Sequence, residues 1–234
     1  MKIGQVVVGL VKSAERNTGV GAWLRGEPRP PRGGFDLEGE KFIDWGWICV
    51  NLPKGRLRAL EIGSGKSPII PAMLALGYEV TAIDLSQDVA SIFSGMAFHN
   101  ADFLQLELRE GFDVIVLCSV VEHIGLFGRY NSSDDPNGDL NAMRKVLKLL
   151  NPDGLLFLTV PVGKDVIHRP WHRVYGRERL KQLLDGFEVV QSRFVLKEPW
   201  GPWHASEEGA ALAVGPDIQR YALGEFILRK KKPS

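Results

Sequence analysis

The stretch LEIGSGKS, Leu60 to Ser67, decides the fold, because it continues an apolar segment and carries two glycines in close succession. A loop that wraps a nucleoside triphosphate needs the spacing G-x-x-x-x-G-K-[ST]. Counting back from Gly65 reaches Leu60 where that loop needs its first glycine. A dinucleotide loop, G-x-G-x-x-G, finds Gly63 and Gly65 but then Pro68, which offers no N–H to a pyrophosphate. The stretch is better suited to a turn at the end of a strand.

Apolar segments of strand length alternate with helical segments from this turn onward, which is typical of a βαβ series. Parallel strands need crossovers, so the first six strands should be parallel. The last strand lacks a crossover helix and should be antiparallel, which gives an α/β, Rossmann-like sheet. We expect strands at 57–62, 78–84, 97–102, 112–120, 155–161, 187–196 and 221–229, and helices that begin at Ser67-Pro68 and at Ser86 and that span 139–150 and 177–184.

Residues 1–55 have a different texture and are interpreted as an N-terminal extension of a domain that spans 56–234. Within the extension, the stretch GEPRPPRGG at 26–34 cannot hold a regular element and is typical of a linker. The stretch NPDG at 151–154 has turn chemistry and should end the preceding helix.

The composition excludes several classes of protein. The net charge of +1 over 234 residues produces no overall field that would attract nucleic acid or a membrane. Cys49 and Cys118 do not make a disulfide framework, and no segment reaches the roughly 20 apolar residues of a membrane span. We therefore expect a cytoplasmic protein without nucleic-acid or membrane partners, and the oligomeric state stays open.

With these elements in place, the chain resembles the class I, seven-strand S-adenosylmethionine-dependent methyltransferases over about residues 57–230. LEIGSGKSP resembles their E/D-x-G-x-G loop, and Asp84 resembles the acidic residue that accepts both ribose hydroxyls. NADF places Asp102, beside Phe103, where the family reads the adenine amino group. SVVEHI, at 119–124, resembles the segment after their fourth strand. The resemblance implies the seven-strand methyltransferase sheet, the corresponding activity and S-adenosylmethionine as cofactor.

The residue types agree with these implied roles. Gly63 and Gly65 permit a tight turn close to a ligand, and Glu61 is placed to organise that turn or to accept from the cofactor ammonium. Asp84 can accept two hydroxyl donors, although a plain helix cap is an alternative role. The implied cofactor-binding set is Glu61, Gly63, Ser64, Gly65, Asp84, Leu85, Asp102, Phe103, Ser119 and His123.

A narrower resemblance is to an uncharacterised methyltransferase-like family that carries E-H-x-G-L-G-R-Y, D-P-x-G-D, V-P-V-G and H-R-x-Y-G. The corresponding stretches here are EHIGLFGRY, DPNGD, VPVG and HRVYG, with Phe127 as an extra residue in the first. This family implies no substrate.

Ligands of open α/β sheets lie beyond the carboxyl ends of the parallel strands. That rule selects the loops 119–138 and 161–176 and the connection 197–221 as the surroundings of the reaction. We expect the connection to cap the acceptor site. The unusual side chains in these segments include Arg129, Tyr130, Trp200, Trp203 and His204.

Two histidines are candidates for a general base, which an oxygen nucleophile commonly needs near neutral pH. His172 is the first candidate, because Arg173 and Tyr175 beside it could bind an anionic or hydroxylated acceptor. His123 is the second. The alternative roles are a hydrogen-bonded loop anchor for His172 and a structural or cofactor-side role for His123.

The acceptor follows only by elimination. Enzymes that methylate amino groups of adenine or glutamine typically carry [ND]-P-P-[YF] after the fourth strand, whereas this chain has CSVV at 118–121. The same stretch supplies no set of carboxylates that could bind a metal for catechol-type transfer. A small molecule remains, such as one with a sugar or glycan hydroxyl. No metal is expected, although a metal at Glu122 and His123 is an alternative. The alternatives are a catalytically inactive S-adenosylmethionine-binding scaffold or regulatory protein and, disfavoured by Pro68, a nicotinamide oxidoreductase.

Overall fold

The computed structural model describes residues 40–87, 89, 94–108, 111–128, 134–197, 202–216 and 221–232. Glu38–Leu196 and His204–Ser234 form one compact unit, which holds the sheet. A second grouping, Met1–Leu37 with Lys197–Trp203, lies almost wholly outside the described residues. The compact unit therefore begins well before the domain boundary that the sequence analysis sets at residue 55.

One sheet organises the compact unit, and its strand order is β3-β2-β1-β4-β5-β10-β8-β9. The neighbours from β3 to β5 are parallel, whereas β10 is antiparallel to both β5 and β8. β8 consequently runs in the direction of β5, and the predicted α/β sheet with an antiparallel last strand is confirmed. The strands are β1 Arg58–Ile62, β2 Glu79–Asp84, β3 Ala97–Asn100, β4 Phe112–Cys118, β5 Leu150–Val162, β8 Phe187–Lys197, β9 Trp203–Ser206 and β10 Ala222–Lys230.

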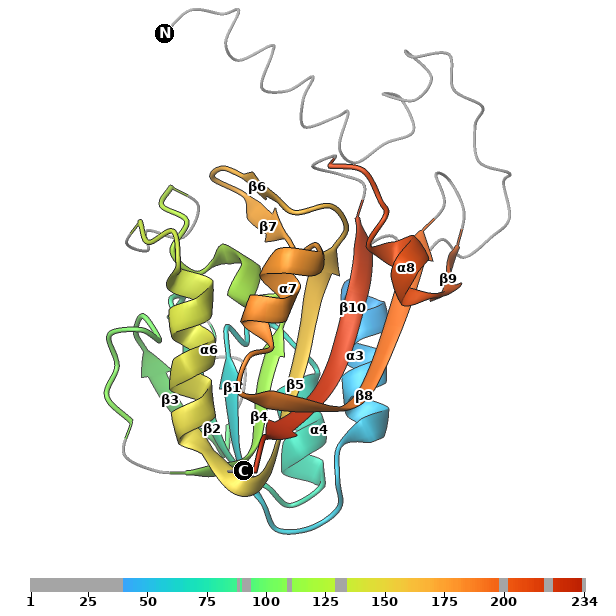
Figure 1. Cartoon of the computed structure of the whole chain (residues 1–234). Helices are drawn as coiled ribbons and strands as arrows, with labels where there is room; N and C mark the ends of the chain where they lie inside the picture. The colour runs from blue at the N-terminus through green and yellow to red at the C-terminus, as the bar shows by residue number, and fades with distance from the viewer. Residues whose placement is uncertain are drawn as a thin grey trace, which may run out of the picture. The chain divides into compact units, whose positions relative to one another are not determined.

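Helices cover both faces of this sheet (Figure 1). Helices α6 and α7 lie on one face, where Met143, Val146 and Leu183 join a large apolar core. Helices α3 and α4 lie on the other, where Trp47, Ile48 and other apolar side chains form a second core. No helix among the described residues is long and apolar enough to cross a membrane. The helices are α3 Lys41–Asn51, α4 Ile69–Ala75, the 3-10 turn η1 Val121–His123, α6 Gly138–Leu149, α7 Arg177–Leu183 and α8 Glu208–Ala211.

Strand β4 lies in the middle of the sheet and is buried over nearly its whole length. Its buried side chains point to both faces, so FDVIVLC shows no alternation of apolar and polar residues.

At the start of α4, the Ser67 hydroxyl accepts the N–H of Ile69 at 3.0 Å, as a capping serine should. Pro68 occupies the position just before the helix.

The expected turn at 151–154 is wrong, because these residues belong to the first part of β5. The register of β5 against β4 shifts between Phe112 and Val114, so the polar residues are accommodated in an irregularity of the ladder. The Asn151 amide donates to Asp113 at 2.8 Å, and Gly154 lies close enough to Phe112 that a Cβ would come within 2.9 Å of its carbonyl oxygen.

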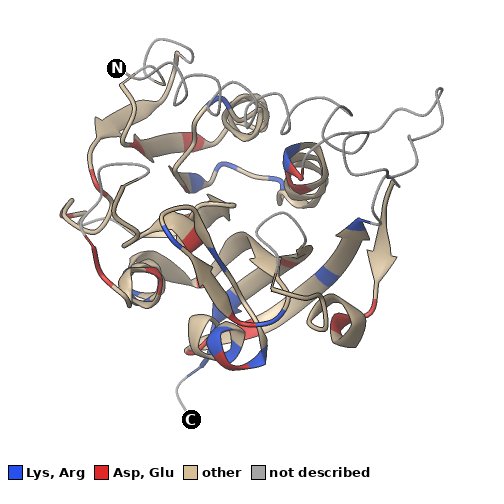
Figure 2. Ribbon diagram, turned by 90° about the horizontal axis from the view of Figure 1, so that it is seen from above, with Lys and Arg blue, Asp and Glu red and all other residues tan. Residues whose placement is uncertain are grey.

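The segment 161–176, expected as a loop, contains a hairpin of β6 (Val166–His168) and β7 (His172–Val174). Each strand has only three residues, which is too short for a periodic signal in the sequence. The connection 197–221 likewise contains β9 and α8. The helix expected from Ser86 lies largely outside the described residues. Seen from above, residues of both charge signs are interspersed over the described ribbon (Figure 2).

Candidate functional site

A cavity of about 290 Å³ opens at the carboxyl ends of β1, β2, β3 and β4. It contains every predicted cofactor-binding residue except Glu61 and Ser64. We call its residues after β1 to β3, namely Gly63, Gly65, Asp84, Leu85, Asp102 and Phe103, the turn side. The complete lining is Lys41, Ile62, Gly63, Gly65, Ile83, Asp84, Leu85, Ala101, Asp102, Phe103, Ser119, Val120, His123 and Ile124.

Glycine is required at Gly63 and at Gly65 for different structural reasons. Both have left-handed backbone, with φ of +68° at Gly63 and +51° at Gly65. A Cβ on Gly63 would come within 2.5 Å of a Val120 methyl group, so this residue lets β1 and β4 approach. A Cβ on Gly65 would meet nothing within 4 Å, and Gly65 lines the cavity.

Glu61 and Ser64 lie beneath the turn rather than in the cavity wall. Both are buried, and among the described residues the Glu61 Oε2 atom and the Ser64 hydroxyl have no hydrogen-bond partner. Burial raises the pKa of Glu61 to about 8, although a hydrogen bond from Ser67 lowers it and the charge of Asp84 raises it. The turn therefore keeps unused polar capacity close to the cavity.

Asp84, at the end of β2, holds the glycine turn in place. Its Oδ2 atom accepts the N–H of Gly65 and its Oδ1 atom accepts the N–H of Ser86, both at 2.8 Å. Each carboxylate oxygen has two acceptor sites, so Asp84 retains capacity for hydroxyl donors in the cavity.

The loop after β3 is fixed by Lys145, which comes from α6. The Lys145 ammonium donates to the carbonyl oxygens of Phe103, at 2.5 Å, and of Leu106, and lies 4.8 Å from the centre of the Phe103 ring. Asp102 accepts the N–H of Leu104 at 2.9 Å, so its carboxylate is oriented by its own loop.

Ser119 follows β4 and is held from α3. With φ of +50°, it is the one residue other than glycine in the described chain with left-handed backbone. Its hydroxyl donates to Asp44 Oδ2 at 2.8 Å, and its N–H donates to the Thr159 carbonyl and hydroxyl, each at 3.1 Å. Burial raises the pKa of Asp44, which has no exposed surface, to about 7.

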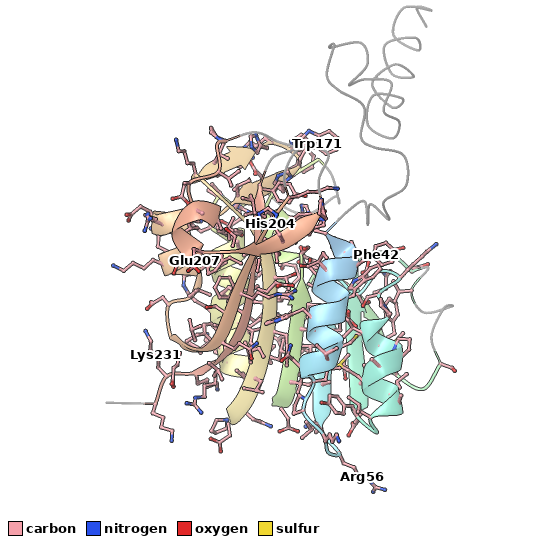
Figure 3. The ribbon with its side chains drawn as sticks, turned by 90° about the vertical axis from the view of Figure 1, so that its right-hand side faces the viewer. Phe42, Arg56, Trp171, His204, Glu207 and Lys231 are labelled. Atoms are coloured by element: carbon pink, nitrogen blue, oxygen red, sulfur yellow. The ribbon has the colours of Figure 1, made fainter. Side chains whose placement is uncertain are left out.

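Three histidines and a tyrosine meet beside the cavity at the hairpin β6–β7. The ring of His172 lies 6.4 Å from that of His123 and 5.5 Å from those of His168 and Tyr221. His123 lines the cavity and its Nδ1 atom lies 2.6 Å from the Trp171 carbonyl oxygen, whereas His172 is 9% exposed and is not part of the lining. We call the set His123, His168, His172 and Tyr221 the hairpin side. Figure 3 shows Trp171 and Phe42 toward one end of the compact unit and Arg56 toward the other.

The suggestion that Arg173 and Tyr175 bind an acceptor is not supported by their positions. Arg173 is 1% exposed and donates to the carbonyl oxygens of Glu122 at 3.3 Å and Ile124 at 2.7 Å. Tyr175 is fully buried and its hydroxyl donates to Asp139 at 3.2 Å. Because they are two positions apart in extended backbone, the two side chains share one face, and both are buried there.

The expected cap over the acceptor site stays a prediction. His204 lies in β9 and does not line the cavity, and Trp203 belongs to the second grouping of residues. Trp200, Arg129 and Tyr130 lie outside the described residues.

Sequence reasoning missed Lys41, which lines the cavity from the first residue of α3. It belongs to the segment interpreted as an extension, and no motif marks it. The one signal was FIDWGWICVNL at 42–52, whose apolar residues indicated packing against the domain. Sequence reasoning also missed Asp44, a buried carboxyl beside it.

The family model described as "Caenorhabditis protein of unknown function, DUF268" matches residues 69–198, more than half of the chain. The chain belongs to the DUF268 family. The matched segment runs from the start of α4 through β8 and thus includes the carboxyl ends of β2, β3 and β4. The match to DUF268 begins after the glycine turn and α3, so these two parts of the cavity wall lie outside the matched residues.

Two curated proteins resemble this DUF268 chain in sequence. YqeM of Bacillus subtilis (strain 168), named as a candidate methyltransferase, is 30% identical over 124 residues, which are 49% of the chain. The chain spans about half of the length of YqeM, 46%. The ubiquinone biosynthesis O-methyltransferase of Rhodopseudomonas palustris (strain HaA2) is 27% identical over 174 residues, covering 65% of the chain and 67% of that protein.

The structure of the N-methyltransferase NodS from Bradyrhizobium japonicum WM9, in complex with S-adenosyl-L-homocysteine, resembles the DUF268 chain in fold. The TM-score is 0.58 at 19% identity, and the match covers 88% of the chain and 94% of NodS. The likeness shows that the fold is that of class I S-adenosylmethionine-dependent methyltransferases.

Proposed function

We propose that the chain is an S-adenosylmethionine-dependent methyltransferase that acts on a small-molecule acceptor. The observation that carries the proposal is the cavity itself. Segments after four successive strands place Asp102, Asp84, the glycine turn and His123 around one space. The methyltransferase names of YqeM and of the ubiquinone biosynthesis enzyme, and the fold shared with NodS, support it.

The residues present fit the proposed cofactor. The space above Gly65 leaves room for a ligand against the backbone, and the buried Ser64 hydroxyl and Glu61 Oε2 atom are unsatisfied at the same turn. Asp84 would accept the ribose hydroxyls, and Asp102 the adenine amino group beside Phe103. Leu85 and Ser119 would complete the wall of the cofactor site.

When bound, the cofactor supplies an electrophilic methyl group. The residues of the chain would bring an acceptor into line and exclude water, which can provide much of the rate. Of the two candidate bases, only His123 lines the cavity, so we propose that His123 faces the acceptor. His172 would support it through the contact of their rings, 6.4 Å apart at their centres. An oxygen acceptor would lose its proton on this side.

The nature of the acceptor is the finer part of the proposal. A hydroxyl of a sugar or glycan fits an imidazole base such as His123, which lines the cavity. The narrower methyltransferase-like family remains part of this proposal. An inactive scaffold that binds the cofactor would have the same turn side, and the two differ only in methyl transfer.

Calorimetry with S-adenosylmethionine, S-adenosylhomocysteine and NAD tests the proposal. The wild-type chain should bind the first two and not the third. Asp84→Ala removes a charged acceptor and should weaken S-adenosylmethionine binding about 10–150-fold, equivalent to about 1.5–3 kcal/mol. Asp84→Asn can still accept from Gly65, so it separates the loss of charge from disorder of the turn.

The matched control is Asp113→Asn. Asp113 also accepts a backbone N–H, that of Arg58 at 2.9 Å, but lies at the opposite end of β4. Wild-type affinity retained in folded Asp84→Ala would contradict the cofactor site. Binding of S-adenosylmethionine without release of S-adenosylhomocysteine from any of a wide panel of acceptors would instead favour the scaffold.

A further inference from the structure

The charged residues of the cavity are segregated. Asp102 and Asp84 follow β3 and β2, whereas Lys41 lies in the lining together with Ser119 and His123, which follow β4. Because the strand order is β3-β2-β1-β4, these positions follow one another along the edge of the sheet. Neighbouring strands lie about 4.8 Å apart, so the acidic end and the Lys41 end are separated by roughly 10–15 Å.

Lys41 is held in the cavity wall with its charge only partly balanced. Its ammonium lies 3.4 Å from the Cys118 carbonyl oxygen, a long contact. The acidic groups around it are Asp44, Glu122 and Glu40, together with Cys118. Burial lowers the pKa of Lys41, but the charges of these groups outweigh burial and raise it overall, so Lys41 is a cation.

Its buried neighbours are poor counterions. Asp44 and Glu122 are buried at 0% and 2% exposure, and one oxygen of each has no hydrogen-bond partner among the described residues. Burial raises the pKa of Asp44 to about 7 and that of Glu122 to about 8. Near neutral pH these two carboxyls therefore balance only part of the charge of Lys41, which lines the cavity and has room for an anionic partner from a ligand.

We propose that Lys41 makes the β4 end of the cavity a carboxylate-binding site, filled by the amino-acid carboxylate of the cofactor. This inference rests on the proposed function, in which Asp84 and Asp102 would hold the nucleoside of the cofactor and leave its amino-acid part to the β4 end of the cavity. The acidic end would repel a carboxylate, and Lys41 attracts it. α3 thus completes the cofactor site from outside the segment that begins at the glycine turn.

Two ligands that differ only in this group test the proposal: S-adenosylmethionine and decarboxylated S-adenosylmethionine. The wild-type chain should bind the carboxylated form more tightly. Lys41→Met should weaken S-adenosylmethionine about 10–100-fold and change the affinity for the decarboxylated form by less than about threefold. Lys41→Arg should keep most of the preference, since a guanidinium also binds a carboxylate.

Lys66→Met is the matched control, because Lys66 adjoins Gly65 but is exposed and outside the lining. Equal loss for both ligands in Lys41→Met would show a structural role and overturn the proposal, as would no loss for either. The wild-type preference is informative even if Lys41→Met fails to fold: equal affinity for the two ligands also overturns it.

The same chemistry could come from an acceptor carboxylate instead. In that case Lys41→Met would bind both cofactor forms like the wild type, and the wild-type complex with S-adenosylhomocysteine would bind propionate where the variant complex would not. That result would overturn the assignment to the cofactor. A wild-type chain that binds neither S-adenosylmethionine nor S-adenosylhomocysteine would refute the proposed function itself, and with it this inference.

Discussion

The turn side and the hairpin side of the cavity are built in different ways. On the turn side, the two carboxylates bind partners that are close in the chain or on a neighbouring strand: Asp102 orients its own loop, and Asp84 accepts from Gly65 and Ser86. Lys145 of α6 adds a contact from further along the chain, to the Phe103 carbonyl oxygen. On the hairpin side, His123 meets Trp171 across 48 positions, and Tyr221 lies beside the Glu40 carboxylate from the other end of the chain.

On the proposed function, this difference would separate cofactor binding from chemistry. A turn after a strand needs a few residues in fixed order, so the part that would hold the cofactor is compact in sequence. The part that would face the acceptor is assembled from η1, the hairpin and the segment before β10, and each piece can vary independently. The following predictions, in order of decreasing effect, test whether the two sides are separate in function and stability.

The histidines should show the largest effect. His123→Asn should lower turnover about 10²–10⁴-fold while S-adenosylhomocysteine affinity changes by less than about threefold, because a base contributes to rate and not to cofactor binding. Turnover is measured as S-adenosylhomocysteine release with an acceptor found by screening hydroxylated metabolites. His99→Asn, on β3 and outside the cavity lining, is the control. A larger loss of turnover in His172→Asn than in His123→Asn would instead make His172 the first candidate for the base, as the sequence analysis proposed.

Arg173→Met should cost about 3–5 kcal/mol of unfolding free energy, because it leaves the carbonyl oxygens of Glu122 and Ile124 and the buried Asp139 carboxylate with fewer partners. Urea unfolding followed by circular dichroism measures this loss. The hairpin offers its own control in Arg169→Met, which breaks an exposed pair with Asp134 and should cost about 0–1 kcal/mol. A stable Arg173→Met chain that fails only in turnover would return Arg173 to the acceptor site.

Gly63→Ala should cost about 2–5 kcal/mol, because its Cβ overlaps a Val120 methyl group at 2.5 Å and the backbone is left-handed. Gly65→Ala bears only the backbone strain and should cost about 1–2 kcal/mol, yet it should weaken S-adenosylmethionine binding by filling the cavity. Chemical unfolding and calorimetry on both variants separate the effects. Val120→Ala should recover part of the stability lost in Gly63→Ala, and no recovery would contradict the overlap.

The stability of the turn side should depend on pH through Glu61. Because burial raises its pKa from 4.5 to about 8, the folded chain holds a proton that the unfolded chain has lost between these values. The folded state binds more protons, so unfolding free energy should fall as pH rises from about 5 to about 8, by up to about 1.4 kcal/mol per pH unit.

Glu61→Gln should remove the contribution of one carboxyl to the pH dependence of the unfolding free energy. The pKa values of Asp44 and Glu122 are raised in the same direction, so their contributions should remain. The exposed Glu79→Gln is the control and should leave the slope unchanged. Urea unfolding at a series of pH values measures both. A slope identical in wild type and Glu61→Gln would mean that Glu61 is ionised in the folded chain.

The sequence by itself determined the strand series, the antiparallel last strand and the residues that surround the turn side. These follow from short-range rules: strand periodicity, glycine in a tight turn, and an acidic residue at a strand end. Reliance on short-range rules also explains why the prediction of a turn at 151–154 was wrong: the irregular pairing of β5 with β4 accommodates these polar residues within a strand.

Only the tertiary structure decided that Lys41 lines the cavity, that Asp44 holds Ser119, and that Arg173 of the hairpin is buried. Each depends on a contact between segments that are far apart in the chain, here 75 positions for Asp44 and Ser119. Such contacts produce no motif of fixed spacing in the sequence, because the packing of the folded chain determines which residues become neighbours. The turn side could therefore be predicted from the sequence. On the hairpin side the sequence indicated His123 and His172 as candidates but not how they meet, and it did not indicate the role of α3.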